Sequence, residues 1–137
     1  MAISEVDRNL INKAALFLKE QGYVMEFDEN TIYYVKDDIT LSIAYPPNSD
    51  TSSVDIRFNG VNRLFNIGWI ALVRGGVKGY SEKLEDVKEL LKYVRENYKE
   101  ITNYQFCIDS DELIDEYCKK HEEEFQKKIS DFLESNK

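Results

Sequence analysis

The single histidine of this chain, His121, is the residue on which most nucleophilic catalysis would have to depend. A serine or cysteine nucleophile is usually activated by a histidine base. His121 follows Tyr117 by four residues and precedes Phe125 by four, so it falls on the expected apolar face of a helix. This spacing favours a partly buried structural histidine, and we expect no catalytic triad.

Cysteine and histidine side chains could also bind a metal ion. Cys118 and His121 are one helical turn apart, and Cys107 could join them. Structural zinc sites usually need a fourth ligand and paired short spacings, which this sequence does not offer. We therefore expect two buried free thiols, no metal and no cofactor.

Acidic runs and a glycine-rich loop are the other features that could take part in catalysis or ligand binding. Asp37-Asp38 has the composition of a turn. In the run Glu122–Glu124, the pairs Glu123–Lys127 and Glu124–Lys128 are typical of an exposed helix face. The loop Arg74–Gly79 combines glycines with cations but matches neither common phosphate-binding motif. We predict no catalytic residue and no enzyme, and the loop stays an alternative small-molecule site.

Tyrosines and acidic residues in the middle of the chain suggest a surface that binds a protein. Tyr33 and Tyr34 are adjacent in a predicted strand, so one of them faces outward. An outward tyrosine near several carboxylates would suit a basic protein partner. Alternatively, the tyrosines only reflect the preference of aromatic residues for strands. The predicted partner-binding residues are Tyr34, Asp37, Asp38, Asp50 and Asp55.

Residues 23–74 predict five strands in a row, separated by short polar or glycine-containing turns. Strands joined in this way are antiparallel neighbours, so we predict an α+β fold: an antiparallel five-stranded meander preceded by one helix and followed by two helices. The fifth strand, Leu64–Arg74, is apolar on both faces, and Asn66–Val73 could instead form a helix. The expected strands have the sequences YVMEF, TIYYVK, ITLSIAY, SSVDIRF and LFNIGWIALVR.

Helical patterns flank this predicted sheet. The first helix should begin at Ser4, with Asp7 as its capping partner, and end at Gly22. The second has an apolar stripe against which Trp69 should anchor the core. Residues 103–109 could be a short strand or an ordered linker, followed by a last helix from about Ser110. The second stripe contains Leu84, Val87, Leu91, Val94 and Tyr98, and the last helix should pack by Leu113, Tyr117, Cys118, His121, Phe125, Ile129 and Phe132 or Leu133.

The size and charge of the chain restrict its partners. Its 137 residues fit one domain, residues 1–137, and its net charge of −8 argues against binding to nucleic acid or to anionic membranes. Residues 82–137 hold 16 acids and 10 bases, so most of the excess lies in the predicted C-terminal helices. The chain shows no export signal, and its longest apolar run, Trp69–Val73, is short, so we expect a cytoplasmic protein.

Size, acidity, tyrosine-rich strands and the order helix–sheet–helix resemble the small immunity proteins of bacterial toxin–immunity systems. The run Phe65–Arg74 and the strands before it contribute to this resemblance. It implies a stoichiometric inhibitor that binds and neutralises a basic toxin domain. Two alternatives remain: a homo-oligomeric regulatory or scaffold domain that buries the doubly apolar fifth strand, and an enzyme that uses the loop Arg74–Gly79.

Overall fold

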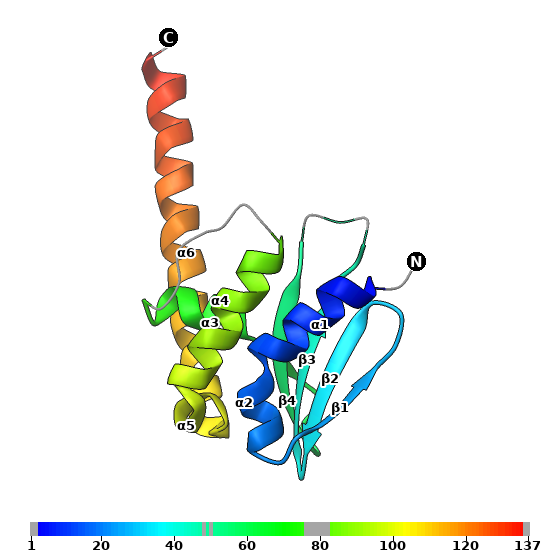
Figure 1. The fold of residues 1–137 in the computed structure, drawn as a ribbon. Coiled ribbons are helices and arrows are strands. Elements are labelled where there is room, and N and C mark those ends of the chain that lie inside the picture. Colours follow the sequence, from blue (N-terminus) through cyan, green and yellow to red (C-terminus); the bar gives the residue numbers. More distant parts are fainter. Residues whose placement is uncertain (1–2, 48, 50, 76–82, 136–137) are drawn as a thin grey trace.

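The computed structural model describes residues 3–47, 49, 51–75 and 83–135. It contains a five-stranded antiparallel sheet with helices before and after it (Figure 1). The strands lie side by side in chain order, because each turn returns the chain next to the strand just completed. The predicted α+β class and antiparallel meander are confirmed. The strands are β1 (Val24–Phe27), β2 (Thr31–Lys36), β3 (Ile39–Ala44), β4 (Ser53–Phe58) and β5 (Leu64–Asn66).

The register of the sheet separates a covered face from an open one. On the covered face, one row of partners across the four strands β2–β5 is apolar apart from the tyrosine hydroxyl, and all its members are buried: Tyr34, Leu41, Ile56 and Phe65. On the open face, the neighbouring row is polar and half-buried: Tyr33, Ser42, Asp55 and Asn66. This alternation is what a sheet with one packed face requires.

The helical segment before the sheet is divided into α1 (Glu5–Ala14) and α2 (Leu16–Glu20). The side chain of Ser4 accepts a hydrogen bond of 3.1 Å from the backbone N–H of Asp7, as predicted. Gly22 has a φ of 98°, a value that glycine adopts readily and other residues rarely do, and there the chain turns towards β1.

The prediction of a long fifth strand is wrong beyond Asn66, where the alternative prediction of a helix is confirmed. The chain leaves β5 there and forms α3 (Ile67–Val73), because the side-chain oxygen of Asn66 accepts a hydrogen bond of 2.9 Å from the N–H of Trp69 and caps the helix. The apolar run is helical, and the residues that it buries have helical spacing: Ile67, Ile70 and Ala71.

Three further helices follow in the described part of the chain: α4 (Lys83–Glu96), α5 (Tyr98–Ile101) and α6 (Tyr104–Ser135). The predicted stripe of α4 is confirmed at Val87, Leu91 and Val94, which are buried. Residues 103–109 are neither strand nor linker. Asn103 accepts a hydrogen bond of 3.1 Å from the N–H of Phe106, so the last helix begins at Tyr104 rather than near Ser110.

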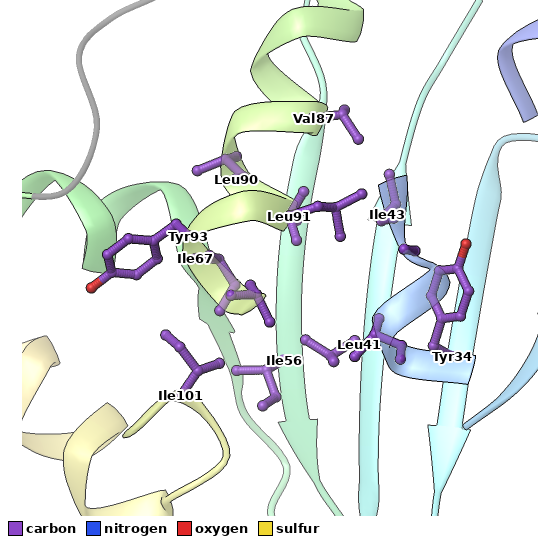
Figure 2. Packing of buried hydrophobic residues seen from close by; sticks show 14 of the residues in the cluster. Tyr34, Leu41, Ile43, Ile56, Ile67, Val87, Leu90, Leu91, Tyr93 and Ile101 are labelled. Atoms are coloured by element: carbon purple, nitrogen blue, oxygen red, sulfur yellow. The ribbon is translucent and has the colours of Figure 1, made fainter. Parts of the chain in front are cut away.

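The core lies between the covered face of the sheet and the helices. Figure 2 shows Leu91 of α4 beside Ile43 of the sheet, with Leu41, Ile56 and Ile67 further along the same layer. These side chains are at most 1 % exposed. The charged side of α4 faces away, and no described helix is long and apolar enough to cross a membrane.

Trp69 does not anchor this core. It is 42 % exposed, because α3 turns its buried side, Ile67 and Ile70, towards the sheet and α4, and Trp69 lies on another side of the same helix. The large aromatic side chain inside the core is Phe65, which is fully buried and meets Phe58 edge to face at 6.0 Å. The predicted role of Trp69 is therefore wrong.

Candidate interaction surface

The predicted tyrosine-and-carboxylate patch does not form around Tyr34. Tyr34 is opposite Leu41 in the sheet register, so it points to the helix-covered face and is only 3 % exposed. Its hydroxyl donates a hydrogen bond of 2.6 Å to Oδ1 of Asn12 in α1. The outward position belongs to Tyr33, and the assignment of Tyr34 as an outward residue is wrong.

Asp55 lies on the opposite face from Tyr34 and is surrounded by its own hydrogen-bond donors. The hydroxyl of Ser53 and the amide of Asn66 both donate to its carboxylate, the latter at 3.3 Å. Burial raises the pKa of Asp55 above its ordinary value, while these two hydrogen bonds act in the opposite direction. Its oxygens therefore bond mainly within the sheet.

The other acidic residues of the predicted binding surface that the structure describes do not lie together with Asp55. Asp37 and Asp38 are exposed in the turn between β2 and β3, where Asp37 has a φ of 51°. Asp50 lies outside the described residues. Asp37 and Asp38 thus form the one exposed acidic pair among the predicted residues that the structure describes.

The two cysteines and the histidine do not form a cluster either. Cys107 is buried and its thiol donates to the carbonyl of Ile101 at 3.3 Å, and burial, followed by the nearby Asp111, raises its pKa to about 12. Cys118 and His121 are exposed, which contradicts the prediction of two buried thiols and a partly buried histidine. In the described part of the chain, no group of three or more such side chains is arranged to hold a metal.

The reason for this exposure is the course of α6. The helix begins beside α3 and α5 and then projects beyond the rest of the molecule (Figure 1). Its buried residues, Cys107 and Ser110, belong to the first two turns, and every residue from Cys118 to Ser135 is exposed. The prediction that this helix packs its whole apolar face into the core is therefore wrong.

The projecting part of α6 nevertheless keeps an amphipathic pattern. Its apolar side chains are 39–67 % exposed, although the same residue types are usually buried in proteins. A contiguous exposed apolar strip on a helix is typical of a surface that another protein covers. We call the strip the distal seam, which consists of Cys118, His121, Phe125, Ile129 and Phe132.

Charged residues of alternating sign border one side of the distal seam. Lys120, Glu124, Lys128 and Asp131 follow one another at intervals of four, four and three residues, so they lie on one flank of the helix. Along the helix, the charges of this flank therefore follow the order positive, negative, positive, negative. If this flank is placed against the same flank of a second helix that runs in the opposite direction, each positive residue faces a negative one.

At its base, the distal seam meets a row of aromatic rings. Trp69 contacts Tyr117 edge to face with centroids 6.1 Å apart, and Tyr117 lies 4.2 Å from the ring of His121. A shallow hollow beside these rings is lined by residues of α3 and α6, including Leu72 and Leu113. The apolar surface thus continues from the projecting helix onto the body of the molecule.

Sequence reasoning kept the helix α3 only as an alternative to a strand, and it missed the exposure of the distal seam. The capping position of Asn66, three residues before Trp69, was a visible signal for α3. The exposure of the distal seam follows from the length of α6, whose 32 residues span about 48 Å, more than the roughly 30 Å diameter of a small domain.

Comparison with known proteins gave no match. No family model, no curated protein and no solved structure corresponds to this chain.

Proposed function

We propose that this protein is a non-catalytic protein-binding domain that acts by pairing its last helix with the same helix of a second copy. The observation that carries the proposal is the distal seam. Phe125 and Ile129 are 61 % and 39 % exposed on the projecting part of α6, which no other described helix or strand covers. Burying apolar surface contributes about 25 cal/mol per Å², so two such seams gain stability by covering each other.

The charges beside the seam favour an antiparallel pair. When the flank is placed against its own reverse, Glu124 lies opposite Lys128 of the second copy, and Lys120 lies opposite Asp131. Charges that border a helix–helix seam set the orientation of the partners in this way. A parallel pair would instead bring this flank against the other side of the helix.

The same arrangement would place the far end of one helix near the base of the other. Trp69 and Tyr117 form that base, so pairing should cover the indole of Trp69. Trp69 is the single tryptophan of the chain, and its fluorescence therefore reports on this site alone. We expect its emission to shift to shorter wavelength as protein concentration rises.

Sedimentation equilibrium of the whole chain tests the proposal directly. We expect a monomer–dimer equilibrium that Phe125→Ser weakens at least tenfold. Val6→Ser is the matched control, because Val6 is 69 % exposed on α1, away from the seam. A wild-type chain that stays monomeric at all accessible concentrations, or equal losses in both variants, would contradict the proposal.

Charge reversal tests the orientation. Glu124→Lys should weaken association, because it places Lys opposite Lys128 at two symmetric points. The double variant Glu124→Lys with Lys128→Glu should restore association. Glu123→Lys changes the net charge by the same amount on the far side of the helix and should have little effect. Equal weakening by Glu124→Lys and Glu123→Lys, or a double variant that stays as weak as Glu124→Lys, would contradict the proposed pairing.

Disulfide trapping provides an independent check of orientation. In the antiparallel pair, the two Cys118 residues lie about 24 Å apart along the helix, at 1.5 Å per residue. Mild oxidation should therefore leave the wild type uncrosslinked, whereas Leu133→Cys, at a position that borders the seam, should crosslink to Cys118 of the other copy. A disulfide between two wild-type Cys118 residues would support parallel pairing of the helices and would contradict antiparallel pairing.

An acidic inhibitor of a basic protein, as the resemblance to immunity proteins implies, is the second candidate. It is supported by the net charge of −8 and by the exposed pair Asp37 and Asp38. The test is co-expression with the product of the adjacent reading frame. A stoichiometric complex that the double variant Asp37→Ala with Asp38→Ala weakens would favour this candidate over self-pairing.

A further inference from the structure

A groove on the opposite side of the molecule from α6 runs between the first helices and the edge of the sheet. Its volume is about 670 Å³, and its walls are formed by α1 and α2 on one side and by β1 on the other. The apolar part of the lining includes Ala15 and Leu16 from the helices and Val24 and Met25 from the strand. The shape and lining suit an elongated, partly apolar ligand.

The strand at this groove has a free edge. β1 pairs with β2 alone, and no described strand borders its other side. The N–H of Asp28 donates to the carbonyl of Thr31, so Asp28 begins the series of residues that bond to β2. Because this series alternates along an antiparallel strand, Met25 and Phe27 direct their backbone N–H and C=O groups to the free edge.

The charge of the groove is opposite to that of the whole chain. Its charged lining residues are Lys13 and Lys19, and its other polar lining includes Asn9 and Asn12. The net charge of the protein is −8, so a local pair of lysines is a distinct feature. An acidic ligand would be attracted here and repelled by most of the remaining surface.

We propose that this groove binds an extended peptide with an apolar centre and acidic neighbours, which joins the sheet as an added strand beside β1. Its backbone would bond to the free groups of Met25 and Phe27. Alternate side chains would point to the helix side, where Leu16 forms an apolar wall and Lys13 and Lys19 attract carboxylates. Backbone bonds provide affinity in such strand addition, and the side-chain pockets provide specificity.

Nuclear magnetic resonance titration of the whole chain tests this site. The probe is the blocked peptide acetyl-Thr-Asp-Thr-Leu-Thr-Asp-Thr-amide, whose Asp and Leu residues share one face of a strand. We expect saturable shifts of the amide signals of Met25 and Phe27 at millimolar peptide. The same peptide with Lys in place of Asp should bind at least tenfold more weakly.

Substitution of the strand separates backbone bonding from simple apolar binding. Met25→Pro removes an N–H that points to the free edge and leaves the bonds to β2 intact, so it should weaken binding at least tenfold. Met25→Leu keeps the N–H and should retain affinity. If Met25→Pro unfolds the chain, a peptide N-methylated at Leu gives the same information with the wild-type protein, because it also lacks one edge hydrogen bond.

A charge pair of variants completes the test. Lys19→Glu should weaken binding of the acidic peptide, whereas Lys92→Glu, on the exposed side of α4, should not. Absence of any shift at several millimolar peptide would overturn the proposal, as would shifts that survive both Met25→Pro and N-methylation. If the same amides shift with protein concentration alone, the edge pairs with a second copy and the peptide assignment is wrong.

Discussion

The hydroxyl of Tyr34 donates a hydrogen bond of 2.6 Å to Oδ1 of Asn12 and so joins β2 to α1. Tyr34 is also one wall of the groove beside β1, and Asn12 is another. The bond therefore holds the position of the first helix over the sheet. It fixes the width of the groove between them, since α1 is attached to the sheet here by a directed contact.

Removal of this hydroxyl should destabilise the fold modestly. We expect Tyr34→Phe to lower the free energy of unfolding by about 1 kcal/mol, because it removes one part-buried hydrogen bond and keeps the ring in place. Urea denaturation measures this change. Tyr33→Phe is the control on the open face, and an equal loss in both variants would show that the bond to Asn12 contributes nothing specific.

Buried tyrosines should make the protein sensitive to alkaline pH. Burial raises the pKa values of Tyr34 and Tyr23 above the ordinary value near 10, and the hydrogen bond between Tyr23 and Tyr98 acts in the same direction. The unfolded chain then loses these protons at lower pH than the folded one. Stability should be constant below about pH 9 and fall as pH rises through about 10.

Urea denaturation at pH 8 to 11 measures this loss. The fall should be shallower in Tyr34→Phe, which removes one of the ionising groups. A fall of the same steepness in wild type and variant would exclude Tyr34 as a contributor.

Phe65 and Trp69 should differ sharply in their contributions to stability. Phe65→Ala should cost about 3–5 kcal/mol, because Phe65 is fully buried and its removal leaves a cavity. Trp69→Ala should cost about 1 kcal/mol, since the half-exposed indole loses mainly its edge contact with Tyr117. Thermal unfolding of both variants checks the order, and a larger loss at Trp69 would contradict the placement of α3.

The two thiols should react at very different rates with a disulfide reagent at neutral pH. Cys118 is exposed and should be modified at once in the folded protein. Cys107 is buried with a pKa raised to about 12, so its reactive thiolate is scarce until the chain unfolds. Counting thiols before and after adding denaturant gives the result. Two fast thiols in the native protein would contradict the burial of Cys107.

The sheet was predictable because its strands alternate. In β3 and β4 the apolar residues recur at every second position, which determined the two faces, and the short turns between the strands determined the antiparallel order. At Tyr33 and Tyr34 the alternation showed that the two side chains lie on opposite faces of the sheet, but not which of them faces the helices. Only the pairing of Tyr34 with Leu41 shows which tyrosine is covered.

The helix α3 and the exposed face of α6 could not be predicted from periodicity. Both depend on competition between alternative interactions, which periodicity does not describe. The run after Asn66 is apolar on all sides, so its pattern fits a strand or a helix. The helix forms because the side chain of Asn66 caps its first turn. On α6, amphipathicity predicted the apolar face, including Phe125, correctly. It could not show that the core was already filled by α3, α4 and α5, so that nothing of the described chain remained to cover that face.

The two proposed surfaces lie at opposite edges of one rigid sheet. The groove borders β1, whereas α6 packs against α3, which follows β5 at the other edge. Neither occupant would obstruct the other. An antiparallel pair of copies would then be a bivalent molecule, with its two grooves held apart by a helical rod of defined length. A partner carrying two suitable peptide segments would gain avidity from this spacing, and segments on a tether too short to span the rod would not.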